Sequence, residues 1–490
     1  MRAIGFFPWP LVMMAALFIL ISFRSPHSLV FSITGTFALV SLALCRIQSS
    51  PLGVLAPFPI FMLGGALYTL PAALTLAASG TLVSPRGIPT GALMRSALVS
   101  SAALLCAAGG YLVFLSCTAR RVRLHWQSPS WRHGHTTAMM GRLLMAVGIA
   151  AGAHFVFNVV GFKTLRSATY GGRYVLMEGH GLLIGCISLI GLGGLICYAY
   201  FLQRNRPLAS MGGLLCAGIA LGLWTFLTGS RSPLIQFLIA GIVVRQIARK
   251  PISLKALAVF GTVLMAAAIF FEMSGRTFSF RAITSLQKDA ISRINPANSE
   301  LGAPMQTLAD ILQSVPGTEP YKFGATYFEI PAILVPKVFW PDRPQGAGNW
   351  YASRFYTSYW ESGGGYAFSP IAEAYLNFGP LGIVISFFGI GVVLGALERK
   401  LIHHCGLSLW VTIAYAVTVP YILMFFRLDA ATLVKSLGVA VLGPLLVCAA
   451  ANEILREMLR PAKPVASKNS VLGHPVVTDQ NQVGRLDTQH

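Results

Sequence analysis

Glu373 is the residue of this sequence whose type and position most directly suggest chemistry. It lies at the mouth of an apolar run that begins near residue 376 and is long enough to cross a membrane. A carboxylate at that depth is costly unless it is paired or in contact with water. Two interpretations follow: an ion pair with an arginine, or a general base that accepts a proton from a substrate.

Two arginines occupy very short turns between apolar runs. Arg231 lies in the turn Thr228–Pro233, and Arg427 lies in the turn Phe425–Asp429. In the topology derived below both turns face outward, where basic residues are disfavoured in short loops. Arg427 can pair with Asp429 or snorkel, but guanidinium groups also bind phosphate oxygens in bidentate fashion. Further arginines near the outer side are Arg166, Arg173, Arg276, Arg281, Arg343 and Arg354.

Aromatic residues gather between residues 339 and 368, with Trp340, Trp350, Tyr356 and Trp360 among them. Aromatic belts at the membrane interface account for such a cluster. Rings that stack on sugars account for it equally well, since Tyr and Trp combine an apolar face with a polar edge. Metal and cofactor signals are poor, because the histidines of the 118–142 segment fit a solvated loop and no nucleotide-binding motif appears. We therefore expect no metal and no cofactor.

Composition decides which elements position these residues. Of 490 residues, 55% are hydrophobic and 11% are charged, and the mean hydropathy is +0.66. A soluble domain carries about 25% charged residues, so this chain is predicted to be an all-α polytopic membrane protein. Its net charge of +21 is explained by basic cytoplasmic loops rather than by nucleic-acid binding.

A membrane span needs about 20 apolar residues, and this length indicates about twelve transmembrane helices. The predicted spans are 4–23, 29–45, 53–78, 97–117, 143–162, 180–201, 210–228, 233–244, 254–271, 376–396, 407–426 and 431–451. Basic clusters at 118–142, 245–255, 399–400 and 456–485 all fall on one side, which marks the cytoplasm. Both termini are then cytoplasmic.

This topology divides the chain into four parts. Residues 1–271 form an N-terminal bundle of about nine spans, 272–375 form a large periplasmic loop between spans nine and ten, 376–451 form the C-terminal spans, and 452–490 form a tail predicted to be disordered. The loop carries eight basic and nine acidic residues. A loop this long is usually functional.

The periplasmic loop itself has two halves. Apolar residues at helical spacing predict amphipathic helices over 282–294 and 300–315. From Tyr327 to Pro344 four prolines interrupt a strongly apolar stretch. This stretch is predicted to lie at the membrane interface or to dip into the membrane and return. Gly363–Gly365 is predicted to be a hinge.

The motifs of the loop resemble a known family. Ile330–Pro331 through Val335–Pro336, then Trp340–Pro344 and the run Ser369–Gly379, are similar to the late outer loop of the Wzy-type O-antigen or oligosaccharide repeat-unit polymerases. The turn Thr228–Arg231 is similar to an arginine turn in the same proteins. Many of these proteins carry Lys where this sequence has Arg343.

The resemblance implies a glycosyltransferase of the bacterial inner membrane that joins repeat units carried on undecaprenyl pyrophosphate. It implies that Arg231, Arg343 and Arg427 bind the pyrophosphate, with Arg276 and Arg354 in reserve. Glu373 would be the base for the acceptor hydroxyl, and Glu329 and His180 are weaker candidates. Trp340, Trp350, Tyr356 and Trp360 would hold sugars. Expected partners are undecaprenyl-pyrophosphate-linked glycans, membrane lipids, a chain-length regulator and a flippase.

Other functions fit parts of the same evidence. An O-antigen ligase uses the same donor with a different acceptor, and only the loop motifs favour the polymerase. A lipid-glycan flippase or transporter would be expected to show internal repeats and broken helices near the midplane, and it would have no use for the long loop. A structural scaffold for a polysaccharide machine is a further alternative.

Overall fold

The computed structural model describes most of the chain from residue 52 to residue 458. The described residues are 35–36, 39–40, 42–43, 47, 50, 52–79, 88–118, 135–168, 170–177, 179–249, 259, 301–335, 339–344, 346–361, 365–404 and 408–458. The predicted span 4–23, most of the predicted spans 29–45 and 254–271, the predicted helix 282–294, Arg276, Arg281, most of the Gly363–Gly365 hinge and the tail beyond residue 458 lie outside them.

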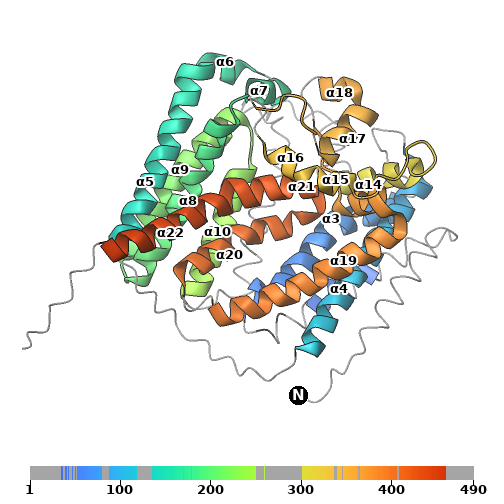
Figure 1. The fold of residues 1–490 in the computed structure, drawn as a ribbon, viewed down its shortest axis with the longest axis horizontal. Helices are drawn as coiled ribbons and strands as arrows, with labels where there is room; N and C mark the ends of the chain where they lie inside the picture. The colour runs from blue at the N-terminus through green and yellow to red at the C-terminus, as the bar shows by residue number, and fades with distance from the viewer. Residues whose placement is uncertain are drawn as a thin grey trace, which may run out of the picture.

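Within the described residues the fold is helical and contains no strand (Figure 1). The long helices are α3 Pro57–Ser79, α4 Thr90–Cys117, α5 His135–His154, α8 Gly181–Gln203, α9 Pro207–Thr228, α10 Ser232–Ala248, α19 Pro370–His404, α20 Leu409–Leu423 and α22 Gly443–Met458. Two π-helical segments extend them, η2 Phe155–Val160 after α5 and η4 Val434–Leu442 before α22. An all-α fold was predicted and is confirmed for the described residues.

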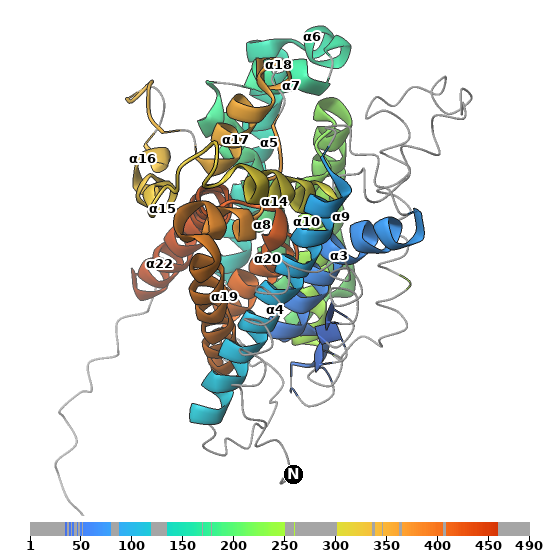
Figure 2. The ribbon, with the colours of Figure 1, turned by 90° about the vertical axis from the view of Figure 1, so that its right-hand side faces the viewer.

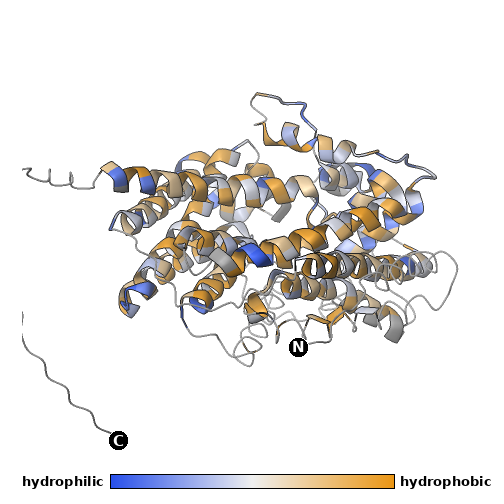
Figure 3. Ribbon diagram, turned by 60° about the horizontal axis from the view of Figure 1, so that its bottom comes forward, coloured by the Kyte–Doolittle hydropathy of each residue, from blue (hydrophilic) through white to orange (hydrophobic). Residues whose placement is uncertain are grey.

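In the part of the chain that the structure describes, six helices are long and apolar enough to cross a membrane: Thr90–Cys117, His135–Val160, Gly181–Gln203, Pro207–Thr228, Pro370–Ile402 and Ala430–Leu455. The ribbons of the bundle helices are coloured mainly as hydrophobic residues, with fewer hydrophilic positions among them (Figure 3). Four shorter apolar helices accompany them, among them Ser232–Ala248 and Leu409–Leu423. The protein is therefore a multi-pass membrane protein, and the total of about twelve spans remains a prediction.

The bundle is held by close contacts between helices. Gly110 of α4 and Gly391 of α19 let the two backbones meet, because a methyl group on Gly391 would lie 1.9 Å from the carbonyl oxygen of Ala107. Farther along α19, the buried carboxylate of Glu398 accepts hydrogen bonds from Tyr111 of α4 (2.6 Å) and from Ser50 (2.8 Å). α4 and α19 therefore pack as a single unit.

Short helices gather at one end of the bundle, which we call the loop end. They are α6 Phe162–Ser167, α7 Tyr170–Met177, α14 Ala303–Ser314, α15 Ala325–Phe328, α16 Ile330–Leu334, α17 Ala347–Phe355 and α18 Thr357–Glu361 (Figures 1 and 2). α14 confirms the helix predicted over 300–315, and Met305, Leu308, Ile311 and Leu312 are buried as its spacing required. The prolines of 327–344 limit this stretch to the short helices α15 and α16.

α19 begins at Pro370, earlier than predicted, and is kinked near its start. Phe378 and Gly379 leave helical geometry, and Pro380 follows them. Pro380 has no N–H to bond the carbonyl of Leu376, and the backbone N–H of Lys322 donates to that carbonyl instead, at 2.9 Å. Phe323 N–H donates to the carbonyl of Asn377 at 3.0 Å. The loop chain therefore replaces the hydrogen bonds that the kink removes.

Candidate functional site

Glu373 lies in the first turn of α19 and is 1% exposed. Its Oε2 atom accepts a hydrogen bond of 2.8 Å from the backbone N–H of Ala430, the first residue of α21 Ala430–Leu433. Among the residues that the structure describes, Oε1 has no hydrogen-bond partner. A buried carboxylate with an unsatisfied oxygen is costly for folding, and such groups are concentrated at functional sites.

Asn377 connects the beginning of α19 to α15. Its Nδ2 atom donates to the carbonyl of Glu373 at 2.8 Å and to Oγ1 of Thr326 at 2.7 Å. Its Oδ1 atom accepts from the backbone N–H of Gly324 at 2.9 Å. Asn377 is fully buried, so its side chain holds the loop against the turn that carries Glu373.

Three further ionisable groups lie around Glu373. Asp429 caps α21 by accepting from Thr432 N–H at 3.3 Å, and it also accepts from Gly348 N–H at 3.2 Å. Glu329 lies between α15 and α16, and burial raises its pKa while the charge of Lys322 lowers it. Burial also raises the pKa of Tyr327, and the negative charge of Glu373 raises it further. Burial therefore favours the protonated forms of Glu329 and Tyr327.

Arg343 binds the end of α16. Its Nη1 atom donates to the carbonyl of Ile333 and, at 2.6 Å, to the carbonyl of Val335. These carbonyls have no partner within the helix at its C-terminus, and a cation there also complements the helix dipole. Arg343 thus has a structural role that its sequence position did not indicate, and α16 in turn packs against α21.

Arg427 and Arg231 lie in the turns where they were predicted. Arg427 is the last residue of the 3-10 turn η3 Phe425–Arg427. It closely precedes Ala430, whose backbone N–H donates to Glu373. Arg231 is the residue before α10 and follows Gly229, whose φ of 73° makes the tight turn. α10 packs against α8 and α20. Both arginines are half-buried residues.

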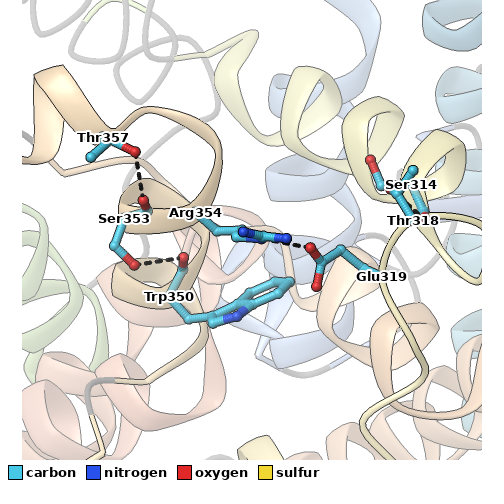
Figure 4. Close-up of polar contacts among 7 residues, drawn as sticks. All are labelled: Ser314, Thr318, Glu319, Trp350, Ser353, Arg354 and Thr357. Carbon is cyan, nitrogen blue, oxygen red and sulfur yellow. Dashed lines mark hydrogen bonds and ion pairs between the residues drawn. The ribbon is translucent and has the colours of Figure 1, made fainter.

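Arg354 lies on α17 and is 62% exposed. Its Nε atom forms an ion pair of 2.6 Å with Glu319 (Figure 4). Beneath it the ring of Trp350 carries Lys322 on its face, with Nζ 4.9 Å from the ring centroid. The acidic partner of Arg354 competes with any phosphate for this guanidinium group.

The predicted sugar-binding aromatic residues differ in their surroundings. Trp350 and Tyr356 pack in a cluster with Tyr351, and Tyr356 donates to the buried carboxylate of Asp310 at 2.8 Å. Tyr351 donates to the same oxygen. Trp340 is exposed, and Trp360 is half-buried on α18. Much of the aromatic cluster is therefore the packed core of the loop end.

A comparison with protein families matches residues 200–456 to the model described as O-antigen polysaccharide polymerase Wzy. This match spans more than half of the chain. The chain belongs to the Wzy family of O-antigen polysaccharide polymerases. Comparisons with curated proteins and with solved structures find no match.

The Wzy match places some of the candidate residues inside the family region and leaves one outside. Glu373, Arg231, Arg343 and Arg427 all fall within residues 200–456. His180 precedes it and contacts the ring of Phe155 edge-on, with 5.8 Å between ring centroids. The membership makes this chain a membrane polysaccharide polymerase and therefore an enzyme, with lipid-linked glycans as its substrates.

Sequence reasoning missed several residues of this Wzy protein's site. Asp429 was considered only as a partner of Arg427, and Asp310, Tyr327 and Asn377 were not singled out for a role. Asn377 lies four residues after Glu373, a spacing that places both on one face of a helix. That spacing could have indicated Asn377, whereas nothing local pairs Asp310 with the tyrosines of α17.

Proposed function

We propose that this Wzy protein joins oligosaccharide repeat units carried on undecaprenyl pyrophosphate, at the periplasmic face of the bacterial inner membrane. A hydroxyl of one lipid-linked unit attacks the reducing-end sugar carbon of another. A new glycosidic bond forms, the bond between that carbon and the pyrophosphate oxygen breaks, and undecaprenyl pyrophosphate leaves. The product is O-antigen or a related surface polysaccharide.

One observation carries this proposal. Glu373 is buried, and among the described residues its Oε1 atom has no hydrogen-bond partner while Oε2 is fixed by Ala430 N–H. A carboxylate that is oriented through one oxygen, and whose other oxygen has no hydrogen-bond partner among the described residues, is suited to accept the proton of an acceptor hydroxyl. In this role Glu373 is the general base, and Glu329 is a second carboxylate beside it.

The arginines supply the positive charge that a pyrophosphate leaving group needs. Two of these arginines lie near α21. Arg427 precedes α21 in the sequence, and Arg343 binds the end of α16, which packs against α21. We assign these two and Arg231 to the pyrophosphate, where charge increases as the bond to the sugar breaks. Trp340, the exposed tryptophan, is the best-placed sugar contact of the aromatic candidates. A chain-length regulator and a flippase are the expected partners.

The test is glycan length in the host. The gene is deleted and complemented with wild type, Glu373→Gln, Arg231→Ala, Arg343→Ala and Arg427→Ala, and the surface polysaccharide is separated on a gel. Removing a general base costs about 10²–10⁴ in rate, so Glu373→Gln is expected to leave core bearing a single repeat unit. Glu361→Gln, an exposed glutamate of α18, is the matched control, and Arg206→Ala controls for the arginines.

The outcomes separate the alternatives. A ladder restored by wild type and both controls, and lost in Glu373→Gln at normal protein level, supports the polymerase with Glu373 as base. Bare core with long lipid-linked chains would identify a ligase instead. A normal ladder in Glu373→Gln would refute the role of Glu373.

A further inference from the structure

Several large apolar side chains on and beside α15 and α16 are exposed. Phe328 is 83% exposed and Phe339 is 80% exposed. We call one set of them the interfacial patch, which consists of Phe323, Phe328, Leu334, Phe339 and Phe378; the exposed Trp340 is not included, because it is the proposed sugar contact. The surfaces of soluble proteins rarely carry so many large apolar side chains together, and such patches mark interaction sites.

The core of the patch is compact. Gly324 lies between two of its rings, because a methyl group at this position would be 3.1 Å from Cζ of Phe378 and 3.4 Å from Cε2 of Phe328. Phe323 is the neighbouring residue, with a φ of 46° that is unusual outside glycine. Three phenylalanines from two distant parts of the chain therefore form one surface.

This surface continues the exposed apolar face of α19. Leu381, Ile385 and Val393 are exposed along the candidate span Pro370–Ile402. These three residues follow helical spacing beyond the kink, so they lie on one side of the helix. In a membrane-spanning helix an exposed apolar side faces lipid. The exposed Phe378 comes just before this side in the chain, and its ring lies beside Gly324, as does the ring of Phe328.

α15 and α16 lie beside the ends of the spans and project from the bundle at the loop end (Figure 2). α15 packs against α19 and α21, and α16 packs against α21 and η4. The pair thus connects the start of one candidate span to the start of another. Arg343 donates to the carbonyls of Ile333 and Val335, so these two carbonyls at the end of α16 are satisfied, as backbone groups near lipid must be.

We propose that the interfacial patch inserts into the bilayer at the loop end, so that α15 and α16 lie in the membrane boundary and contact lipid acyl chains. The occupant follows from continuity with the lipid-facing side of α19. Thr326, on the inner side of α15, is bonded to Asn377 one turn from Glu373. In this arrangement α15 separates the buried carboxylate of Glu373 from the lipid. This proposal does not rest on the proposed chemistry of Glu373.

Photo-crosslinking to lipid tests the insertion. The full chain is reconstituted in nanodiscs that contain an alkyne-tagged phospholipid, with p-benzoylphenylalanine replacing Phe328. The same replacement at Ile385 is the positive control, and at Glu361, exposed on α18, it is the negative control. Lipid labelling at position 328 is expected to equal that at 385 and to exceed that at 361 several-fold.

Two outcomes would overturn the proposal. Labelling at 328 as weak as at 361 would place the patch in water, and a cross-linked product of doubled mass would identify a second copy as the partner. Replacement at the exposed Phe323 repeats the measurement if the variant at 328 does not elute as a single folded species. Because lipid labelling needs no enzymatic turnover, the result for membrane insertion does not depend on whether the proposed polymerase activity is correct.

Discussion

Replacing Asn377 by alanine should release the loop from the beginning of α19. The amide of Asn377 makes three hydrogen bonds of 2.7–2.9 Å, to Thr326, to the carbonyl of Glu373 and from Gly324 N–H. Alanine makes none of them. Because Asn377 is fully buried, water does not replace the lost partners in the folded state.

The size of the effect follows from these contacts. A buried polar group left unsatisfied costs about 1–3 kcal/mol. Gly324 N–H loses its acceptor, and Thr326 loses a donor, so two groups at the lower end of that range give about 2 kcal/mol. Since 1.4 kcal/mol is a factor of ten, the detached state of the loop should become populated about 30-fold more often.

Hydrogen–deuterium exchange of peptides that cover residues 321–328 measures this population. The N–H groups of Lys322 and Phe323 donate to backbone carbonyls of α19, which the substitution leaves in place, so their faster exchange reports detachment of the whole loop. Asn377→Asp keeps the acceptor for Gly324 and should give a smaller increase. Asn349→Ala on the exposed side of α17 is the control. Unchanged exchange in folded Asn377→Ala protein would refute the clamp.

Three other substitutions test the packing around the site. Asp429→Ala should lower the free energy of unfolding by about 1 kcal/mol because the helix cap is lost, and the melting temperature should fall. Asp429→Asn can still cap the helix and should lower the melting temperature less. Equal decreases in the two variants would contradict the capping role. Gly391→Ala should abolish the folded protein peak in size-exclusion chromatography, because its methyl group would meet the carbonyl of Ala107. Gly389→Ala, whose methyl group would have nothing within 4 Å, should behave as wild type. A normal yield of Gly391→Ala would show that α4 and α19 separate easily. Since burial raises the pKa of Glu329, its ionised form opposes folding above that pKa, so Glu329→Gln should raise the melting temperature at alkaline pH and lose this advantage as the pH falls toward 4.5. An advantage independent of pH would exclude ionisation as its cause.

Helices and their approximate limits could be predicted because they depend on local sequence. Long apolar runs must fold as helices where backbone groups find no water, and α8, α9 and the last span follow these runs. The spacing of Met305, Leu308, Ile311 and Leu312 likewise predicted α14. The family motifs around Arg231, Arg343 and Glu373 could be read in the same way, since each is a short contiguous segment.

Contacts between distant segments could not be predicted. The assignment of Arg343 to pyrophosphate stays a prediction, and its sequence position did not indicate that its Nη1 atom donates to the carbonyls of Ile333 and Val335. Much of the aromatic cluster was open to two interpretations, and the structure packs Tyr351 and Tyr356 around Asp310. No periodicity specifies which carboxylate a tyrosine reaches when the two lie in different helices.

By itself the sequence determined that this chain is a helical membrane protein, where many of its spans lie, and which segment carries the candidate chemistry. These properties follow from composition and short-range spacing, which act within a few helical turns. Only the tertiary structure decided that Glu373 is buried with Oε2 bonded to Ala430 N–H, and that Lys322 and Phe323 supply the hydrogen bonds lost at the kink of α19. Such pairings depend on how helices pack, because the free energy of burying or satisfying a polar group is set by neighbours that are remote in the chain.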